Sequence, residues 1–156
     1  MQKFDTTAPI AAVLHIPAGR IRLVAADRAD TTVEVLPADA AKSRDVKAAE
    51  QTDVTYADGV LRIEAPAAKN QILGNSGSVE VTVHLPADSR IEARTGSAEL
   101  RTAGRLGDIA FDGAYRHITI DEAAGVRLTA IEGDVEIGRL TGPAEITTAR
   151  GDIRIA

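Results

Sequence analysis

Apolar and polar residues alternate along most of this chain. The alternation is clearest in five segments, residues 13–16, 20–24, 32–36, 60–64 and 79–85. A period of two sends successive side chains to opposite faces, which is typical of a strand with one buried face and one solvated face. The sequence therefore predicts an all-β protein.

One segment departs from this alternation. Residues 40–51 are rich in Ala, Lys and Glu, and Val46 is their only large apolar residue. Asp39 or Ser43 could cap the N-terminus of a helix there. We expect one short helix near 40–51 that lies on the surface. Residues 65–77, which contain Pro, Asn and Gly, indicate a loop.

A first repetition links two distant parts of the chain. The sequence Val-Leu-His-Ile-Pro-Ala-Gly-Arg-Ile at 13–21 is echoed by Val-His-Leu-Pro-Ala-Asp-Ser-Arg-Ile at 83–91. Proline fixes φ and lacks an N–H group, so it ends a strand and begins a turn. Each copy predicts a strand, a Pro-Ala turn and a second strand.

A second repetition occupies the C-terminal half. Ile91, Ile109, Leu128 and Ile146 follow one another at intervals of 18, 19 and 18 residues. Glycine recurs five residues after most of them and would allow a corner between two strands. A fixed period of this size is typical of stacked repeats. We expect a β-solenoid, similar to a parallel β-helix, with two short strands per coil of 18–19 residues; a β-sandwich is the alternative.

This organisation fits a single domain, 1–156. Residues 1–80 would form an irregular β region carrying the short helix, and residues 81–156 would form the regular coils.

The Gly-Asp-Val/Ile strand repeat at 133–135 and 151–153, preceded by a β region with Pro-Ala turns, resembles a bacterial β-strand-repeat family of unknown function, of the actinobacterial type, often labelled "putative adhesin". The resemblance implies a solenoid-like β fold and an adhesion or envelope role, and it carries no catalytic residue.

Composition narrows the classes of partner. Aromatic residues make up 3% of the chain and cysteine is absent, so the core must consist of aliphatic side chains without disulfides. The formal net charge of -5 argues against nucleic-acid and anionic-membrane partners. No apolar run is long enough to span a membrane and no signal peptide is visible, so we expect a cytoplasmic protein.

Two kinds of residue could bind a metal. His15 and His84 occupy equivalent positions in the Pro-Ala repeat, and His117 lies on an alternating segment. Asp134 and Asp152 are 18 residues apart at one repeat position, which would bring them roughly 5 Å apart. Such a carboxylate pair can bind Ca²⁺, or each Asp can bond the backbone of its turn. We favour turn bonding and expect no metal, no cofactor and solvated histidines.

The functional expectation is a non-catalytic scaffold that binds a protein partner or itself. No Gly-x-Ser-x-Gly motif or Ser/His/Asp set is present, so we expect no enzyme activity. The alternative is a protein that binds carbohydrate or processes polysaccharide, which would need a groove lined with acidic or aromatic residues. The repeat stops without a capping segment, so Ile153 and Ile155 are expected to form a self-association interface, in a two-fold dimer or a filament.

Overall fold

The computed structural model describes residues 2–65 and 77–155, without the side chains of 97, 114–116, 130–132 and 148–150. The loop expected at 65–77 lies almost wholly outside these residues. The chain is all-β, as predicted, with 71% of it in strands. The strands are β1 Gln2–Asp5, β2 Ala11–Ala26, β3 Asp30–Pro37, β4 Asp53–Ala57, β5 Val60–Glu64, β6 Val79–Pro86, β7 Arg90–Ala103, β8 Arg105–Glu132, β9 Asp134–Leu140, β10 Ala144–Arg150 and β11 Ile153–Ile155.

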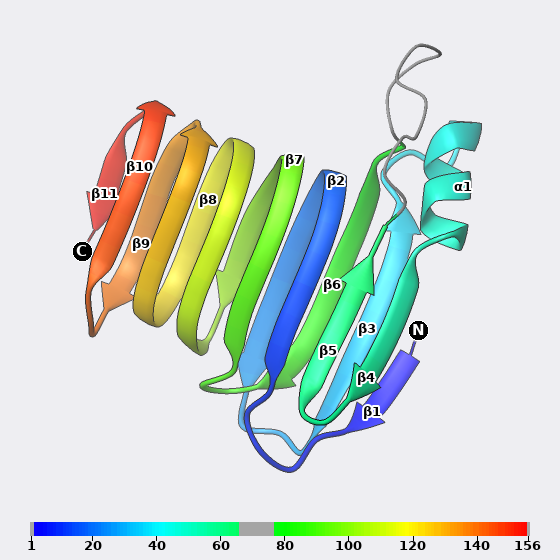
Figure 1. Cartoon of the computed structure of the whole chain (residues 1–156), viewed down its shortest axis with the longest axis horizontal. Coiled ribbons are helices and arrows are strands. Elements are labelled where there is room, and N and C mark those ends of the chain that lie inside the picture. Colours follow the sequence, from blue (N-terminus) through cyan, green and yellow to red (C-terminus); the bar gives the residue numbers. More distant parts are fainter. Residues whose placement is uncertain (1, 66–76, 156) are drawn as a thin grey trace.

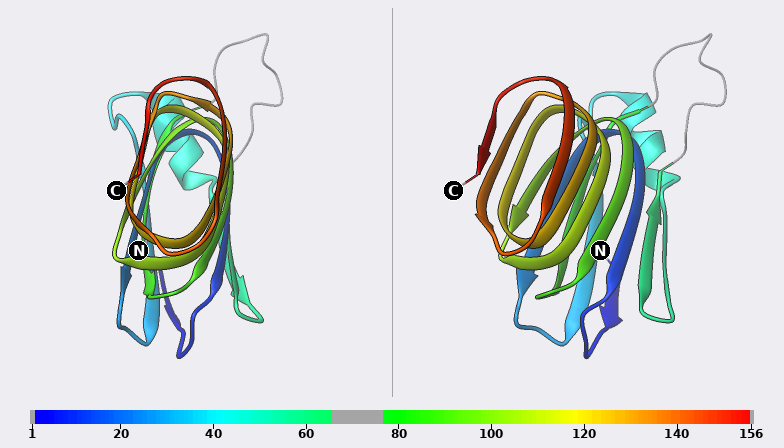
Figure 2. Two further views of the ribbon diagram at one scale, coloured as in Figure 1. Left: turned by 90° about the vertical axis from the view of Figure 1, so that its left-hand side faces the viewer. Right: turned by 60° about the vertical axis from the view of Figure 1, so that its left-hand side comes forward.

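The prediction of a β-solenoid is wrong, and so is the β-sandwich alternative. Five parallel strands close into a barrel, and further strands extend it. The expected coils of two short strands are replaced by long continuous strands of 16 residues in β2, 14 in β7 and 28 in β8. Figure 2 shows these strands curving round a common interior. Of the repeat glycines, Gly96 and Gly113 lie inside β7 and β8, where each strand continues through them, whereas Gly133 and Gly151 separate two strands as predicted.

β2 lies in the middle of the sheet and divides its neighbours between two flanks. Its first half pairs in parallel with β5, and its second half pairs in parallel with β6. β7 pairs with β2 along both halves. We call the side that contains β6 the β6 flank, with order β1-β3-β6-β2-β7-β8-β9-β11. The opposite side is the β5 flank, where β4 pairs with β5 and β10 pairs with β8 (Figure 1).

The core is aliphatic, as the low aromatic content requires. Leu14, Leu23 and Val83 are fully buried inside the barrel, and Phe111 is the one buried aromatic residue among the described side chains. The paired positions follow the sequence period in the C-terminal half. Leu128 is paired with Ile146 and Val135 with Ile153. Leu128 and Val135 are buried, whereas Ile146 is partly buried and Ile153 is exposed, because these lie on strands at the end of the sheet.

The helix α1 spans Ser43–Glu50 and packs beside β3 and β6. Its N-cap is Lys42, which makes no side-chain cap hydrogen bond, so neither Asp39 nor Ser43 takes that role. The helix is also not purely superficial. The buried Asp45 carboxylate accepts the N–H of Asp39 at 3.2 Å and the N–H of Ser78 at 2.8 Å. Asp45 thereby ties the end of β3 to the start of β6.

The second Pro-Ala turn holds β6, β7 and β2 together. Ser89 is completely buried, and its hydroxyl donates to the carbonyl of Pro86 at 2.7 Å and accepts the N–H of Ile10 at 3.1 Å. Asp88, with φ of 67°, binds the Arg105 guanidinium through two contacts of 2.8 and 3.2 Å. The turn thus links the start of β2 to segments that lie about 80 and 95 residues later in the chain.

Candidate functional site

Outward side chains on the β6 flank form rows that cross the strands. Because parallel neighbours are in register, equivalent positions lie roughly 4.8 Å apart from one strand to the next. The acidic row carries mostly carboxylates and one arginine. Its members are Leu36, Glu80, Arg20, Glu99, His117, Asp134 and Asp152.

Arg20 is balanced within the acidic row by carboxylates on both sides. Its guanidinium lies 3.5 Å from the Glu80 carboxylate and 3.4 Å from that of Glu99. Exposed ion pairs of this kind contribute little to folding stability. The order of the acidic row therefore comes from the register of the strands and not from these ion pairs.

Asp134 and Asp152, for which we favour turn bonding over calcium binding, lie at the far end of the acidic row. The Asp134 carboxylate accepts the backbone N–H of Asp152 at 3.0 Å, and the Asp152 carbonyl accepts the N–H of Val135 at 2.8 Å. Among the side chains the structure describes, no group of three or more His, Cys, Asp or Glu residues is placed to hold a metal ion. Asp134 thus bonds the next turn, and the expectation that this pair binds no metal stays a prediction.

The histidines do not come together. His15 lies on the β5 flank, where its Nδ1 is 3.8 Å from the Glu64 carboxylate. His84 and His117 are on the β6 flank, where His84 pairs with Val24 and His117 with Asp134. The repeated sequence around His15 and His84 therefore does not bring these two imidazoles together.

A second row on the β6 flank lies beside the acidic row. We call it the arginine row. It consists of Glu34, Thr82, Arg22, Arg101, Thr119, Glu136 and Arg154. At its centre, two exposed arginines are direct neighbours on β2 and β7. Sequence reasoning missed this pair because Arg22 and Arg101 lie in different halves of the chain, and only the register of β2 with β7 brings them together.

The β5 flank carries a surface depression of about 520 Å³. Its floor contains small outward residues such as Ala11, Ala110 and Gly125, and its charged lining residues are Arg90, Glu92, Asp108, Arg127 and Glu145. The Arg127 guanidinium lies 3.4 Å from the Glu145 carboxylate. The sequence contains no local signal for this depression, because small residues from several strands that are distant in the sequence create it.

The predicted interface residues lie on β11, which pairs with β9. Ile153 is 43% exposed and Ile155 is 46% exposed, so both present aliphatic surface to solvent. Their role in self-association stays a prediction. Among the described residues, no helix is long and apolar enough to cross a membrane.

Comparison with known proteins adds information on the fold. No family model and no curated protein matches the chain. A solved structure described as a "putative cell adhesion protein" from Clostridium sporogenes matches 99% of this chain and 97% of its own, with a TM-score of 0.62 and 10% identity. At this identity the likeness shows a shared fold and nothing more. The actinobacterial type of the resemblance is not shown.

Two further solved structures match over most of their length. A "putative adhesin" from Bacteroides fragilis is 7% identical and covers 99% of this chain and 95% of its own, and a "putative lipid binding protein" from Parabacteroides distasonis is 8% identical and covers 99% and 96%. Each has a TM-score of 0.31, which is too low for an argument about this chain.

Proposed function

We propose that this protein is a non-catalytic interaction scaffold that binds its partner through the β6 flank. The main observation that supports this proposal is the register of the strands on that flank. This register places the acidic row and the arginine row side by side on a continuous sheet. Parallel pairing over an aliphatic core fixes the spacing of these charges before a partner arrives, and pre-organisation lowers the entropic cost of binding. The shared fold with a protein described as a cell adhesion protein supports an adhesion- or envelope-related role.

A pair of matched charge reversals tests the proposal. Glu99→Lys with Glu136→Lys alters the β6 flank, and Glu92→Lys with Glu145→Lys alters the β5 flank. Both double variants change the net charge by the same amount, and each disrupts an ion pair between described residues, Arg20–Glu99 or Arg127–Glu145. Binding of the purified protein to envelope fractions and whole cells of the source organism is then measured by sedimentation.

We expect the β6-flank variant to lose most of its binding and the β5-flank variant to keep it. Melting curves of both variants show whether each is folded. Binding that survives the β6-flank reversal would contradict the proposal. Fractionation of the source cells separates a cytoplasmic scaffold from an envelope-associated one, since the two place the protein in different fractions.

Carbohydrate binding is the second candidate, and the depression on the β5 flank favours it. Its volume lies in the usual range for ligand sites, and Arg90 and Arg127 could bind the carboxylates of acidic sugars. In that case the Glu92→Lys/Glu145→Lys variant should change binding to acidic oligosaccharides, while the Glu99→Lys/Glu136→Lys variant should not. Binding without release of new reducing ends would distinguish a binder from a polysaccharide-processing enzyme.

A further inference from the structure

Two arginines face each other at the centre of the arginine row. Arg22 of β2 and Arg101 of β7 are register partners in parallel strands, and both side chains are exposed. Strand spacing places their backbones roughly 4.8 Å apart. Like charges directly opposite each other in a sheet are destabilising, so the fold tolerates a local electrostatic cost at this point.

No acidic group in the described part of the chain forms an ion pair with Arg22 or Arg101. Arg20 makes the contrast clear, since it lies two residues before Arg22 on the same strand and binds both Glu80 and Glu99. Glu99, the acidic residue two positions before Arg101, is thus already in contact with a cation. The positive charges of Arg22 and Arg101 are therefore available to an anionic group of another molecule.

The neighbours of the pair are hydroxyl residues. Thr82 is the register partner of Arg22 on β6, and Thr119 is the partner of Arg101 on β8. The carboxylates of this row, Glu34 and Glu136, lie one strand farther out on each side. From Thr82 to Thr119 the row thus offers two guanidinium forks and two hydroxyl groups in succession, all of them hydrogen-bond donors.

This donor set suits an oxyanion. A guanidinium presents paired N–H groups that match two oxygens of a phosphate or a sulfate, and charge-assisted bonds of this type are stronger than neutral ones. One doubly charged anion between the two arginines would also cancel their mutual repulsion. We propose that Arg22 and Arg101, with Thr82 and Thr119, bind a phosphate or sulfate group carried by the partner of the β6 flank. The assignment of this group to the partner rests on the proposed function above.

Titration with inorganic phosphate, sulfate and acetate at constant ionic strength tests the site. The comparison is between wild type, Arg22→Gln/Arg101→Gln, and the control Arg62→Gln/Arg94→Gln, which removes the same charge from exposed positions of β5 and β7 on the β5 flank. Phosphate and sulfate should bind wild type and the control, and the Arg22→Gln/Arg101→Gln variant should bind at least about tenfold more weakly, by calorimetry. Acetate should bind more weakly than either dianion to wild type.

The two dianions distinguish the source of the group. Phosphate affinity should fall from alkaline to acidic pH, as inorganic phosphate changes from the dianion to the monoanion, whereas sulfate affinity should not. Tighter binding of phosphate at neutral pH indicates a phosphorylated partner, and tighter binding of sulfate indicates a sulfated one. Equal binding of both dianions by wild type and Arg22→Gln/Arg101→Gln would overturn the site.

A measurement without added anion provides an independent check. Arg22→Gln or Arg101→Gln alone should raise the melting temperature at low salt, because either change removes the repulsion, and the rise should shrink as salt is added. A fall in melting temperature would overturn the proposal, since it would mean that the arginines already have a stabilising partner within the chain. If phosphate binds as expected but the β6-flank charge reversals leave cell binding intact, the proposed function fails and the anion site stands.

Discussion

Gly104, between β7 and β8, lies where one strand passes another at very short range. Its φ is 85°, and a Cβ atom there would lie 2.0 Å from the carbonyl oxygen of Ala25. Gly59, in the turn between β4 and β5, has a similar φ of 76° but no atom within 4 Å of the Cβ position. Substitution of these two glycines therefore distinguishes the energetic cost of backbone strain from the cost of a steric clash.

We expect Gly104→Ala to destabilise the protein more than Gly59→Ala. Gly59→Ala should cost about 1 kcal/mol, which is the strain of a left-handed backbone conformation for a residue with a side chain. Gly104→Ala adds displacement of the Ala25 backbone and should cost about 3 kcal/mol or more. Urea unfolding of both variants measures the difference, and equal losses would show that the β7–β8 connection and β2 can move apart at little cost.

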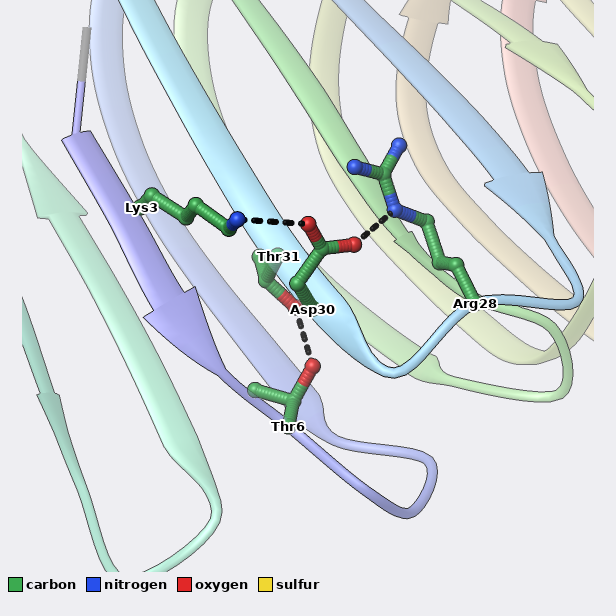
Figure 3. Close-up of polar contacts among 5 residues, drawn as sticks. All are labelled: Lys3, Thr6, Arg28, Asp30 and Thr31. Atoms are coloured by element: carbon green, nitrogen blue, oxygen red, sulfur yellow. Dashed lines mark hydrogen bonds and ion pairs between the residues drawn. The ribbon is translucent and has the colours of Figure 1, made fainter.

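Asp30 holds the N-terminal edge of the sheet by polar contacts. Its carboxylate lies 2.6 Å from the Arg28 guanidinium and 3.6 Å from the Lys3 ammonium, and beside it the hydroxyls of Thr6 and Thr31 share a buried hydrogen bond of 2.9 Å (Figure 3). The hydrogen bond from Arg28 and the positive charges lower the pKa of the Asp30 carboxyl below its ordinary value.

A lowered pKa in the folded state gives Asp30 a stabilising effect that depends on pH. The effect is fully present above the ordinary aspartate pKa of about 4 and is lost as the pH falls through the lowered pKa of the folded state. We therefore expect Asp30→Asn to be less stable than wild type at pH 6, with a difference that narrows below about pH 4. Unfolding curves across this range measure the narrowing, and a constant difference would mean that Asp30 acts without its charge.

At the scale of elements, β9 and β11 show how the position of a strand in the sheet decides whether its aliphatic side chains are buried. Val135 of β9 and Ile153 of β11 are register partners with similar side chains, yet Val135 is 1% exposed and Ile153 is 43% exposed. β9 lies between β8 and β11, whereas β11 is the last strand of the path. Burial therefore follows from the neighbours of a strand more than from its sequence.

Val135→Asp should destabilise the protein by about 3 kcal/mol or more, because it places an unpaired charge in an aliphatic core. Ile153→Asp, the matched change on the neighbouring strand, should cost no more than about 1 kcal/mol, since the new carboxylate remains in water. Thermal unfolding of the two variants measures both values. Comparable losses would indicate that the outer side of β11 is covered in solution.

The alternation of Val, Ile and Leu with polar residues was sufficient to predict strands, and the 18-residue interval was sufficient to predict which residues pair in the C-terminal half. The long strands could not be predicted in this way. Gly113 has a left-handed φ of 84° but lies inside β8, so a residue that usually ends a strand here bends it. The central pairing of β2 was also hidden, because β5, β6 and β7 lie at unequal distances along the chain.

The candidate site was harder to predict than the fold. Asp134 and Asp152 were found by their spacing, since both belong to the regular repeat. Arg22 and Arg101 share no motif, and their proximity depends on the register between β2 and β7. A single sequence contains no local signal for that register, because a shift of two residues would preserve the same alternation.

At the scale of the whole molecule, we expect the β11 end of the sheet to be a surface for self-association. Ile153 and Ile155 present aliphatic side chains on a strand that pairs with β9 on one side, and exposed strand edges recruit other strands. We expect the protein to associate through β11 at high concentration, with a two-fold dimer as the commonest closed arrangement.

Light scattering of wild type, Ile153→Lys and Leu36→Lys measures this association. Leu36 is 47% exposed on β3, so Leu36→Lys introduces the same charge at a similarly exposed aliphatic residue far from β11. Ile153→Lys should reduce the apparent mass at high concentration, and Leu36→Lys should not. A strict monomer in all three samples would contradict the prediction.

The central position of β2 has a consequence for synthesis on the ribosome. β2 is complete at Ala26, but its partner β7 ends at Ala103, so β2 lacks that full partner for about 4 to 15 seconds at ordinary translation rates. During that time the edge of this 16-residue strand that faces β7 stays unpaired, even after β5 and β6 have been made, which favours chaperone binding or misassembly. β8, β9, β10 and β11 differ, because each pairs with a strand that has already been made. Folding of the first half is therefore delayed until β7 has been made, whereas the strands of the second half can pair as they emerge from the ribosome.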